Sequence, residues 1–267
     1  MKVSIVTISF NQAEFLEKAI LSVLNQDYLD VEYIVVDPGS TDGSREIIEK
    51  YRDRINHIIY ESDEGPADGL NKGFAAATGE IYGYLNADDI LLPTTVSHFV
   101  KYFYSSDADV ISGHGYIIDR GGNITGKTFS HKFDPVAYAY GACVLIQQST
   151  FFKAEWFKKV GGFNKSNRAS WDGELCFDMA MQGAKFKRIS GFWSGFRLYA
   201  ESITGSGEFQ DKANQVLLRH ARQLNIEGLN STMMKRWYWL KVRLFDPALI
   251  MQKMIAIWKR NEYKKFD

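Results

Sequence analysis

A pair of carboxylates follows an apolar segment in the first third of the chain. Residues 81–90 read Ile-Tyr-Gly-Tyr-Leu-Asn-Ala-Asp-Asp-Ile, so Asp88 and Asp89 stand where a buried strand should end. In an open parallel sheet, ligands bind outside the carboxyl ends of the strands. Adjacent carboxylate oxygens suit Mg²⁺ or Mn²⁺, which in turn bind diphosphates. The pair therefore predicts a metal-bound phosphate, with a helix N-cap before Pro93 as the alternative interpretation.

A further acidic residue occupies the same kind of position upstream. Asp37 follows two valines and opens the turn Asp-Pro-Gly-Ser-Thr-Asp-Gly at 37–43. Its carboxylate could accept hydrogen bonds from the imide or amide edge of a nucleobase, and Gly39 would let the backbone approach a ligand closely. Any strand-to-helix turn uses the same residue types. The turn alone therefore leaves both interpretations open.

The predicted elements must bring these turns to one edge of a sheet. The hydrophobic pattern predicts strands at 3–10, 33–36 and 57–60 and a fourth before Asp88, separated by helices at 12–26, 44–51 and 67–77. Asn11 is the expected N-cap of the first helix. Strand and helix alternate over about 90 residues, which is typical of a doubly wound parallel sheet. The ends of the first, second and fourth strands should then line one crevice.

The second half of the chain has a different rhythm. A helix is expected at 94–104, followed by short strands near 110–112, 116–118 and 124–129, with Gly121-Gly122-Asn123 as a hairpin turn. This half should be mixed or antiparallel. The sequence lacks a Gly-x-x-x-x-Gly-Lys-Ser/Thr loop, and no Gly-x-Gly-x-x-Gly follows the first strand. P-loop ATP hydrolysis and standard dinucleotide binding are therefore disfavoured.

Five blocks of sequence, in order, resemble the GT-A glycosyltransferases of family 2, a large group of bacterial polysaccharide and glycolipid enzymes. The resemblance runs from Val3 to about Thr204. The blocks are Val-Ser-Ile-Val-Thr-Ile-Ser-Phe-Asn at 3–11, Val-Val-Asp-Pro-Gly-Ser-Thr-Asp-Gly-Ser at 35–44, Gly-Leu-Asn-Lys-Gly at 69–73 with Ala-Thr-Gly-Glu at 77–80, Tyr-Leu-Asn-Ala-Asp-Asp at 84–89, and Trp-Asp-Gly-Glu-Leu at 171–175.

This resemblance implies an α/β fold in which a Rossmann-like nucleotide-binding sheet merges with a smaller mixed acceptor-side sheet. Residues 1–215 would form the GT-A domain, with 1–105 as the nucleotide-binding half and 106–215 as the acceptor half. Residues 216–267 would form a basic, amphipathic C-terminal helical extension.

The resemblance also implies roles for individual residues. Asp37 corresponds to the residue that pairs with the nucleobase, and Lys72 is a candidate contact for phosphate or sugar. The other implied nucleotide-binding residues are Ser9, Asn11 and Ser40 around the uridine, Asp68 and Asn71 beside the nucleotide, and Asn86, Asp88 and Arg197 near the diphosphate.

Asp88 corresponds to the metal-binding member of the family's Asp-x-Asp element, whose first position is here Asn86. An amide carries no charge, so Mn²⁺ or Mg²⁺ would rest mainly on Asp88, on Asp89, on water and on the diphosphate itself. Tyr199 stands where relatives often carry a His. A phenol is a poorer metal ligand at neutral pH, which argues against a metal-binding role for this segment.

Asp172 occupies the position of the catalytic base, before a helix expected at 175–182. Transfer of a sugar with inversion requires removal of a proton from the acceptor hydroxyl while a nucleoside diphosphate departs. Glu174 is the second choice for the base, and an N-cap carboxylate is the structural alternative for Asp172. The resemblance implies an inverting, metal-dependent transfer from a nucleotide-diphosphate sugar, with a UDP-sugar as the expected donor, to a glycan or lipid-linked acceptor in cell-surface polysaccharide assembly.

Two other functions compete with this interpretation. A sugar nucleotidyltransferase shares the sheet and the metal carboxylates, but it usually opens with a glycine-rich loop containing Arg and ending in Lys, which Ser-Phe-Asn-Gln at 9–12 does not resemble. A non-catalytic sugar-nucleotide-binding protein is favoured by Asn86 and Tyr199.

The C-terminal residues form a separate electrostatic region. From residue 231 onward, nine Lys or Arg outnumber three acids by 6, which leaves 23 basic against 29 acidic residues before it. Apolar residues recur there at helical spacing on either side of Pro247, at Met233, Trp237, Leu240, Leu244, Ile250, Met254, Ile257 and Trp258. This pattern predicts amphipathic helices that bind an anionic membrane surface, or that pack on the catalytic domain or on a second subunit as a homo-oligomer.

Overall composition excludes some classes of partner and location. The formal net charge is zero, so no bulk field would recruit nucleic acid. Cys143 and Cys176 fit no metal-ligand spacing and are expected to be small core residues in a reducing compartment. The start of the chain lacks an apolar signal core, and no run of about 18 apolar residues occurs. We therefore expect a cytoplasmic protein, with the tail as a means of peripheral attachment to the inner face of the cell membrane.

Overall fold

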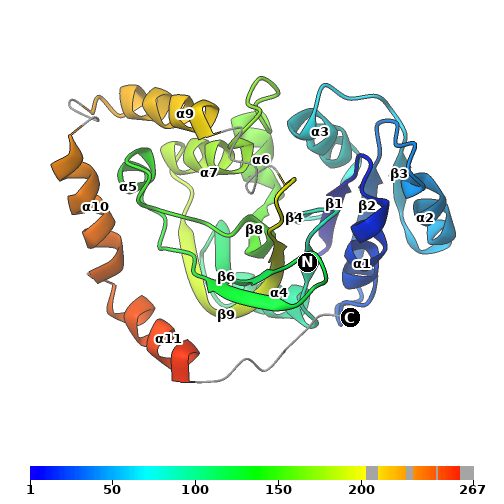
Figure 1. The fold of residues 1–267 in the computed structure, drawn as a ribbon, viewed down its shortest axis with the longest axis horizontal. Coiled ribbons are helices and arrows are strands. Elements are labelled where there is room, and N and C mark those ends of the chain that lie inside the picture. The colour runs from blue at the N-terminus through cyan, green and yellow to red at the C-terminus, as the bar shows by residue number, and fades with distance from the viewer. Residues whose placement is uncertain (203–209, 227–230, 245, 259–267) are drawn as a thin grey trace.

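A computed structural model describes residues 1–202, 210–226, 231–244 and 246–258. This part of the chain is built around one nine-stranded sheet with helices on both faces (Figure 1). The strands are β1 (Val3–Ile8), β2 (Val31–Val36), β3 (His57–Ile59), β4 (Ile81–Asn86), β5 (Ile90–Leu91), β6 (Val110–Ile118), β7 (Ile124–Thr128), β8 (Thr150–Lys153) and β9 (Phe186–Arg197). The helices are α1 (Ala13–Leu24), α2 (Ser44–Lys50), α3 (Pro66–Ala76), α4 (Thr95–Tyr104), α5 (Pro135–Ala139), α6 (Ala154–Val160), α7 (Trp171–Met181), α9 (Gln210–Gln223), α10 (Thr232–Leu244) and α11 (Pro247–Trp258), with 3-10 turns η1 (Arg52–Arg54) and η2 (Gln147–Ser149).

The first half is the expected parallel sheet, with strand order β3-β2-β1-β4. Its strands are rich in β-branched residues that are buried on both faces, as in sheets covered by helices on two sides. Ile8 lies level with Val36 on one side and with Asn86 on the other. The carboxyl ends of β1, β2 and β4 therefore meet at one edge, and the prediction of a shared edge is confirmed.

Two apolar clusters hold the layers together. On one face, α1 and α4 pack through residues such as Leu16 and Phe99 against Ile5 of β1. On the other face, α3, α6 and α7 pack through residues such as Phe74 and Leu175. Because helices cover both faces, the turns at the strand ends remain as the accessible edge of the sheet.

The second half is mixed, as predicted. Strand β8 pairs antiparallel with β4 and β6, whereas β6 runs parallel to β9 and forms a hairpin with β7. The expected strands at 110–112 and 116–118 are one continuous strand, β6. It passes close to the ring of Trp193, where a Cβ at Gly113 would come within 2.1 Å of the indole. The glycine at this position is required by packing and does not end the strand.

Two local predictions were wrong. Asn11 is not an N-cap: its φ is +51°, and Gln12 occupies the cap position of α1 without a side-chain hydrogen bond. Helix α7 begins at Trp171 and not at residue 175, so Asp172 lies in its first turn. Ser170 is the residue before the helix, and the hydroxyl of Tyr138 fixes its side chain.

Helices α9, α10 and α11 follow one another along one side of the molecule in Figure 1. The predicted boundary between residues 215 and 216 falls inside α9, and the division into domains stays a prediction. Among the described residues, none of the helices has the length and apolar composition needed to cross a bilayer. The end of the family resemblance at Thr204 and the basic residues beyond 258 lie outside the described part of the chain.

Candidate active site

An open cleft of about 540 Å³ lies at the carboxyl ends of β1, β2 and β4. Ser9 follows β1, Pro38 follows β2, and Asn86 ends β4; all three line it. Tyr199, just after β9, closes another side. Segments almost 200 residues apart in the sequence thus form one cleft. It lies outside the carboxyl ends of the parallel strands, where ligands bind in open α/β sheets.

Asp88 presents the more accessible carboxylate of the acidic pair. It is half-buried in the cleft wall, and its Oδ2 accepts one hydrogen bond, from the Tyr199 hydroxyl at 3.2 Å. Burial raises its pKa. Within the part of the chain that the structure describes, no group of three or more His, Cys, Asp or Glu is placed to hold an ion. One carboxylate nevertheless fits Mg²⁺ or Mn²⁺, which commonly take one or two protein carboxylates together with substrate phosphates and water.

Asp89 is differently placed. It is 1% exposed, and both of its oxygens accept hydrogen bonds. Oδ1 accepts from the backbone N–H of Arg197 at 2.8 Å, and Oδ2 accepts from Nε2 of Gln148 at 2.7 Å. Burial, followed by the neighbouring charge of Asp88, raises its pKa well above the ordinary value. These contacts hold β9 against the end of β4, and they leave little room for an ion.

Arg197 is buried as well, and its guanidinium is occupied by backbone carbonyls. Nε donates to the carbonyl of Asp88 at 2.7 Å, and Nη1 donates to the carbonyls of Asp119 and Arg120 at 2.7 and 2.9 Å. The side chain stacks over the ring of Phe15 at 4.8 Å. Arg197 lines the cleft, but in this structure it fixes the loop that carries Asp88.

Three polar oxygens at this edge of the sheet are buried without a hydrogen-bond partner. They are Oγ of Ser9, Oδ2 of Asp37 and Oδ1 of Asn86, one after each of the strands β1, β2 and β4. Buried polar atoms nearly always have partners in folded proteins, because an unpaired one costs about 1–3 kcal/mol. Three such atoms at one edge are the pattern expected where a polar ligand completes the hydrogen bonds.

Asp37 itself is fully buried and holds its own turn. Its Oδ1 accepts hydrogen bonds from the backbone N–H groups of Gly39 and Ser40 at 3.0 and 2.8 Å and from Nε of Arg45 at 3.1 Å. Ser40 in turn accepts from the backbone N–H of Asn11 at 2.8 Å. Ser40 and Asn11 therefore link the turns after β1 and β2, and Oδ2 of Asp37 is left unpaired beside the cleft-lining Pro38.

The helix α3 residues implied by the resemblance are engaged elsewhere. Asn71 exchanges two hydrogen bonds with the backbone of Phe163, at 2.8 and 2.9 Å. Asp68 pairs with Lys165 at 2.5 Å and with Lys72 at 3.5 Å, and Lys72 donates to the carbonyl of Ser62. The cleft lining does not include Asp68, Asn71 or Lys72. In this structure they join α3 to the loops on either side of the cleft.

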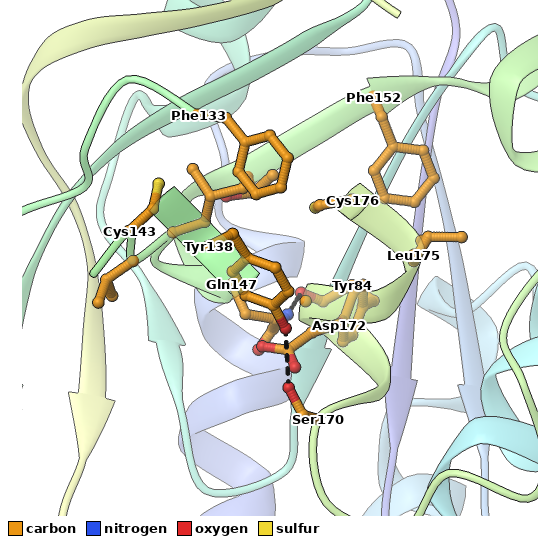
Figure 2. A pocket seen from close by; sticks show the side chains of 14 residues that line it. Tyr84, Phe133, Tyr138, Cys143, Gln147, Phe152, Ser170, Asp172, Leu175 and Cys176 are labelled. Carbon is orange, nitrogen blue, oxygen red and sulfur yellow. Dashed lines mark hydrogen bonds between the residues drawn. The ribbon is translucent and has the colours of Figure 1, made fainter. Parts of the chain in front are cut away.

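Asp172 lines a second cavity, of about 170 Å³, next to the cleft. Figure 2 shows its carboxylate at one end of this cavity, near the hydroxyl of Tyr138 and the side chains of Gln147 and Ser170. The remaining walls are mainly apolar or aromatic. Burial raises the pKa of Asp172, which a hydrogen bond from the backbone of Gly173 partly offsets.

The first turn of α7 separates the two cavities. Trp171 lines the cleft, whereas Asp172, the next residue, lines the second cavity. Asp37, Asp88 and Asp172 therefore do not line a single pocket. They lie around two adjoining spaces whose common walls are the end of β4 and the start of α7.

Glu174, the second choice for the base, has a structural environment. It is 6% exposed. Its carboxylate accepts hydrogen bonds from Nδ2 of Asn164 at 3.1 Å and from Nδ2 of Asn167 at 2.5 Å, and it pairs with Arg219 of α9. Of the two acids, Asp172 has the freer carboxylate.

Sequence reasoning missed the loop before α3 and the arginine opposite it. Asp63 and Gly65 line the cleft, and so does Arg168. A Cβ at Gly65, whose φ is +123°, would lie 1.9 Å from Nη1 of Arg168. The absence of a side chain at Gly65 thus leaves room for the guanidinium of Arg168 in the cleft. A Gly-Pro pair at a helix start was the available signal, but nothing in the sequence links it to a residue about 100 positions away.

The fold and the two cavities define a class of protein: an α/β nucleotide-binding fold with an open cleft for a phosphorylated ligand and an adjoining cavity that contains a carboxylate. The profile of the family described as "Glycosyl transferase family 2" matches residues 4–199. The chain belongs to glycosyl transferase family 2, and it is a glycosyltransferase that uses a nucleotide-sugar donor.

Two relatives illustrate the range of similar sequences. An uncharacterized glycosyltransferase of Nostoc sp. is 28% identical over 258 residues, covering 91% of this chain and 79% of its own length. A GalNAc(5)-diNAcBac-PP-undecaprenol beta-1,3-glucosyltransferase of Campylobacter jejuni is 33% identical over 135 residues, covering 49% of this chain and 43% of its own length.

Solved structures confirm the GT-A fold. S. aureus TarS in complex with UDP-GlcNAc superposes with a TM-score of 0.67 at 16% identity, covering 91% of this chain and 79% of that one. A mannosyltransferase from Pyrobaculum calidifontis in complex with GDP-Man and Mn²⁺ gives 0.66 at 17% identity, covering 97% of this chain and 76% of that one. At these identities the likeness establishes the fold alone.

Proposed function

We propose that this protein transfers a sugar from a UDP-sugar, with inversion, to a glycan or lipid-linked acceptor in cell-surface polysaccharide assembly. The observation that carries the donor assignment is the set of three unpaired oxygens of Ser9, Asp37 and Asn86 at the cleft edge. The bound UDP and UDP-GlcNAc of the TarS structures and the lipid-diphosphate acceptor named for the C. jejuni relative support it.

Base recognition follows from the free oxygen of Asp37. A carboxylate oxygen accepts a hydrogen bond, so it suits a base that presents an N–H on its pairing edge. Uracil and thymine have this imide N–H, and guanine has an equivalent one, whereas cytosine has an acceptor there. Asp37 therefore disfavours CDP-sugars, and Ser9 and Asn11 would flank the uridine.

Asp88 is the residue that would hold Mn²⁺ or Mg²⁺, with Asn86 beside it. When bound, the ion neutralises charge on the departing diphosphate. Asp88 supplies the more accessible carboxylate of the Asp88–Asp89 pair, and the Tyr199 hydroxyl orients it. Asp89 and Arg197 are positioning residues that fix the Asp88 loop through the contacts described above.

Asp172 would act as the base from the adjoining cavity. The acceptor hydroxyl oxygen bonds to the anomeric carbon of the donor sugar as the bond from that carbon to the diphosphate oxygen breaks, with the electron pair leaving on the nucleoside diphosphate. The proton of the hydroxyl goes to the Asp172 carboxylate. The position of Asp172, one residue after the cleft-lining Trp171, supports a role for it between donor and acceptor. The raised pKa makes the carboxylate a better proton acceptor.

Calorimetry with UDP, GDP, TDP and CDP, each with and without Mn²⁺, tests the donor assignment. We expect UDP to bind most tightly, more so with Mn²⁺, and CDP to bind weakly. The same measurement on Asp37→Asn should lose the preference for UDP over CDP. If no nucleoside diphosphate bound, the donor assignment would be wrong. If UDP bound but no UDP-sugar was turned over, a non-catalytic sugar-nucleotide-binding protein would replace the enzyme proposal.

The helices α10 and α11 support peripheral attachment to an anionic membrane. Tyr238 and Val242 of α10 pack on the catalytic domain. On the opposite face of the helix, Met233, Trp237 and Leu244 are 75%, 50% and 58% exposed. Arg236, Lys241 and Arg243 lie on the two sides of this apolar stripe, as in helices that lie in the headgroup region of a bilayer.

Helix α11 also exposes an apolar face. Leu249 and Ala256 are buried, whereas Met251, Met254 and Ile255 are 58%, 66% and 45% exposed. Flotation with phosphatidylcholine vesicles, with and without phosphatidylglycerol, tests the attachment. We expect binding that requires phosphatidylglycerol and that is lost in Met233→Ser with Trp237→Ser, but retained in the control Leu29→Ser. A stable dimer without vesicle binding would assign these faces to a homo-oligomer.

A further inference from the structure

A groove of about 770 Å³ separates the start of α11 and the end of α10 from the catalytic domain. Four of its lining residues are basic: Lys132, Lys187, Arg188 and Lys241. Its two acids, Asp134 and Asp246, are paired with Lys241 at 3.1 Å and with Arg188 at 3.0 Å. The groove lining therefore has a positive surplus of two charges: Lys132 is exposed, and the ammonium of Lys187 lies 5.8 Å from the centroid of the Tyr102 ring.

Arg188 provides the independent sign of an anionic ligand. Its side chain is only 7% exposed, and its Nε is buried without a hydrogen-bond partner, although the two Nη atoms pair with Asp246. A buried guanidinium N–H without an acceptor is costly. An anion in the groove would supply that acceptor.

The surroundings of Arg188 add further positive charge. Burial and then the charges of Arg243 and Arg188 lower the pKa of Lys253. His131, which is 5% exposed, has its pKa lowered to about 4 by burial and then by Arg243, so it is neutral and adds no charge at pH 7. Asp246 is the acid that offsets these charges at Lys253, and a bound anion would further relieve the mutual repulsion of the cations.

The groove adjoins the cavity of Asp172 through one residue. Phe133 lines both spaces, and Figure 2 shows it at the far end of the cavity from the Asp172 carboxylate. Its ring stacks on Phe186 with centroids 4.6 Å apart. On the outer side, the groove is walled by Val242 and Pro247, which belong to the two helices with exposed apolar faces. From the outside inward, the apolar faces of α10 and α11 are thus followed by the basic groove, then by the aromatic cavity, and finally by the proposed base, Asp172.

We propose that this groove binds the phosphate or diphosphate of a lipid-linked acceptor, so that the sugar reaches Asp172 past Phe133 while the lipid lies along α10 and α11. The inference rests on the proposed transferase function and names the acceptor class for it. Lys132 and Lys187 supply the positive charges that no acid in the groove lining neutralises, and Arg188 supplies the buried donor.

Binding of farnesyl diphosphate, measured by calorimetry with the donor cleft saturated by UDP and Mg²⁺, tests the proposal. We expect it to bind at least about tenfold more tightly than farnesol, since the basic side chains of the groove can form charge-assisted hydrogen bonds with the diphosphate but not with the alcohol. Lys132→Gln with Lys187→Gln should weaken farnesyl diphosphate about tenfold. The control Lys18→Gln with Lys101→Gln, at exposed sites on α1 and α4, should leave it unchanged.

A second variant addresses Arg188 without leaving Asp246 unpaired. Arg188→Gln with Asp246→Asn removes both charges, and thermal unfolding shows whether it is folded. We expect folded protein with farnesyl diphosphate affinity reduced about tenfold or more. Equal binding of farnesol and farnesyl diphosphate, or unchanged affinity in both double variants, would overturn the groove assignment. Asp88→Asn separates the two proposals, because it should impair UDP binding with Mn²⁺ and leave farnesyl diphosphate binding intact.

Discussion

Buried polar groups have hydrogen-bond partners at the amino end of the parallel sheet, whereas several lack them at the carboxyl end. At the amino end, Glu32 is 3% exposed, and it accepts hydrogen bonds from Lys2 at 2.6 Å, from Ser4 at 2.5 Å and from the backbone of Thr78 at 2.7 Å. At the carboxyl end, Ser9 and Asp37 keep buried oxygens without a partner. The strands are the same, and their two ends lie about 20 Å apart.

The amino end of the sheet therefore serves stability, and the carboxyl end serves binding. Burial would raise the pKa of Glu32, but the bonds from Lys2, Ser4 and Thr78 more than offset it and lower the pKa to about 2. The charged form is therefore favoured in the folded protein. The unsatisfied oxygens at the other end cost stability until a ligand supplies donors, which is the usual condition of a binding site.

The largest expected effect is on turnover, in Asp172→Asn. Removing the base should lower kcat about 10³-fold, because general base catalysis contributes about 10²–10⁴-fold. UDP binding should be retained, and the melting temperature should stay the same or rise, since a buried charge is removed. Steady-state kinetics, calorimetry and thermal unfolding provide these measurements.

Glu174→Gln is the matched control, expected to lower stability through its contacts with Asn164, Asn167 and Arg219. The pH profile is a second check. The base must be deprotonated to accept a proton, so turnover should fall as acidification protonates Asp172. Because the pKa of Asp172 is raised, this fall should occur at a pH above the ordinary Asp pKa of about 3.9. Full activity of Asp172→Asn would refute the assignment of the base.

The second effect is on stability alone, in Glu32→Gln. A pKa lowered from 4.5 to about 2 favours the folded state above the unfolded pKa, so the substitution should cost about 2–3 kcal/mol at pH 7. This contribution should disappear as the pH falls from about 4.5 towards 2. Urea unfolding at several pH values measures it. A change in the UDP affinity of Glu32→Gln would contradict the assignment of stability to the amino end of the sheet and of binding to the carboxyl end.

A smaller effect, confined to metal-dependent binding, is expected for Asp88→Asn. UDP affinity in the presence of Mn²⁺ should fall at least about tenfold, with little change when metal is absent. Stability should change by less than about 1 kcal/mol, since Asp88 accepts a single side-chain hydrogen bond, from Tyr199. Asp89→Asn serves as the comparison: it should lower stability more, because it weakens the contacts to Arg197 and Gln148.

The smallest effect is expected for Ser9→Ala. The buried hydroxyl has no hydrogen-bond partner in the protein, so the stability of the free protein should stay the same or rise by about 1 kcal/mol. UDP affinity should fall about threefold to tenfold if the hydroxyl contacts the nucleotide. Ser4→Ala, at the other end of β1, should show the reverse, with reduced stability and unchanged affinity. If Ser9→Ala and Ser4→Ala changed stability and UDP affinity to the same extent, the proposed difference between the two ends of β1 would be wrong.

Much of the fold was predictable because local patterns agree with it. Alternating strands and helices predicted that β1, β2 and β4 run parallel, and the Gly121-Gly122-Asn123 turn predicted the β6–β7 hairpin. The family resemblance added the GT-A class, which the profile match and the solved structures confirm. The errors fell where packing overrides local preference, at the start of α7 and at Gly113 beneath Trp193.

Site residues were harder to rank from the sequence, because several acids and polar residues occupy similar turns. Asp88 and Asp89 are adjacent and chemically identical, yet one carboxylate opens to the cleft and the other is enclosed by Arg197 and Gln148. Asp172 and Glu174 differ in the same way, since Glu174 is enclosed by two asparagines and Arg219. Each of these partners lies far along the chain or in another element.

The sequence by itself determined the order of the elements, the strand ends that carry polar residues and the basic character of the tail, because these depend on side-chain type and spacing along the chain. Only the tertiary structure decided which buried oxygens lack a hydrogen-bond partner. It also decided that the start of α7, at Trp171, separates two cavities and that Phe133 lines both the Asp172 cavity and the basic groove. Those properties depend on which distant donors reach each group, and that is fixed by packing across the sheet.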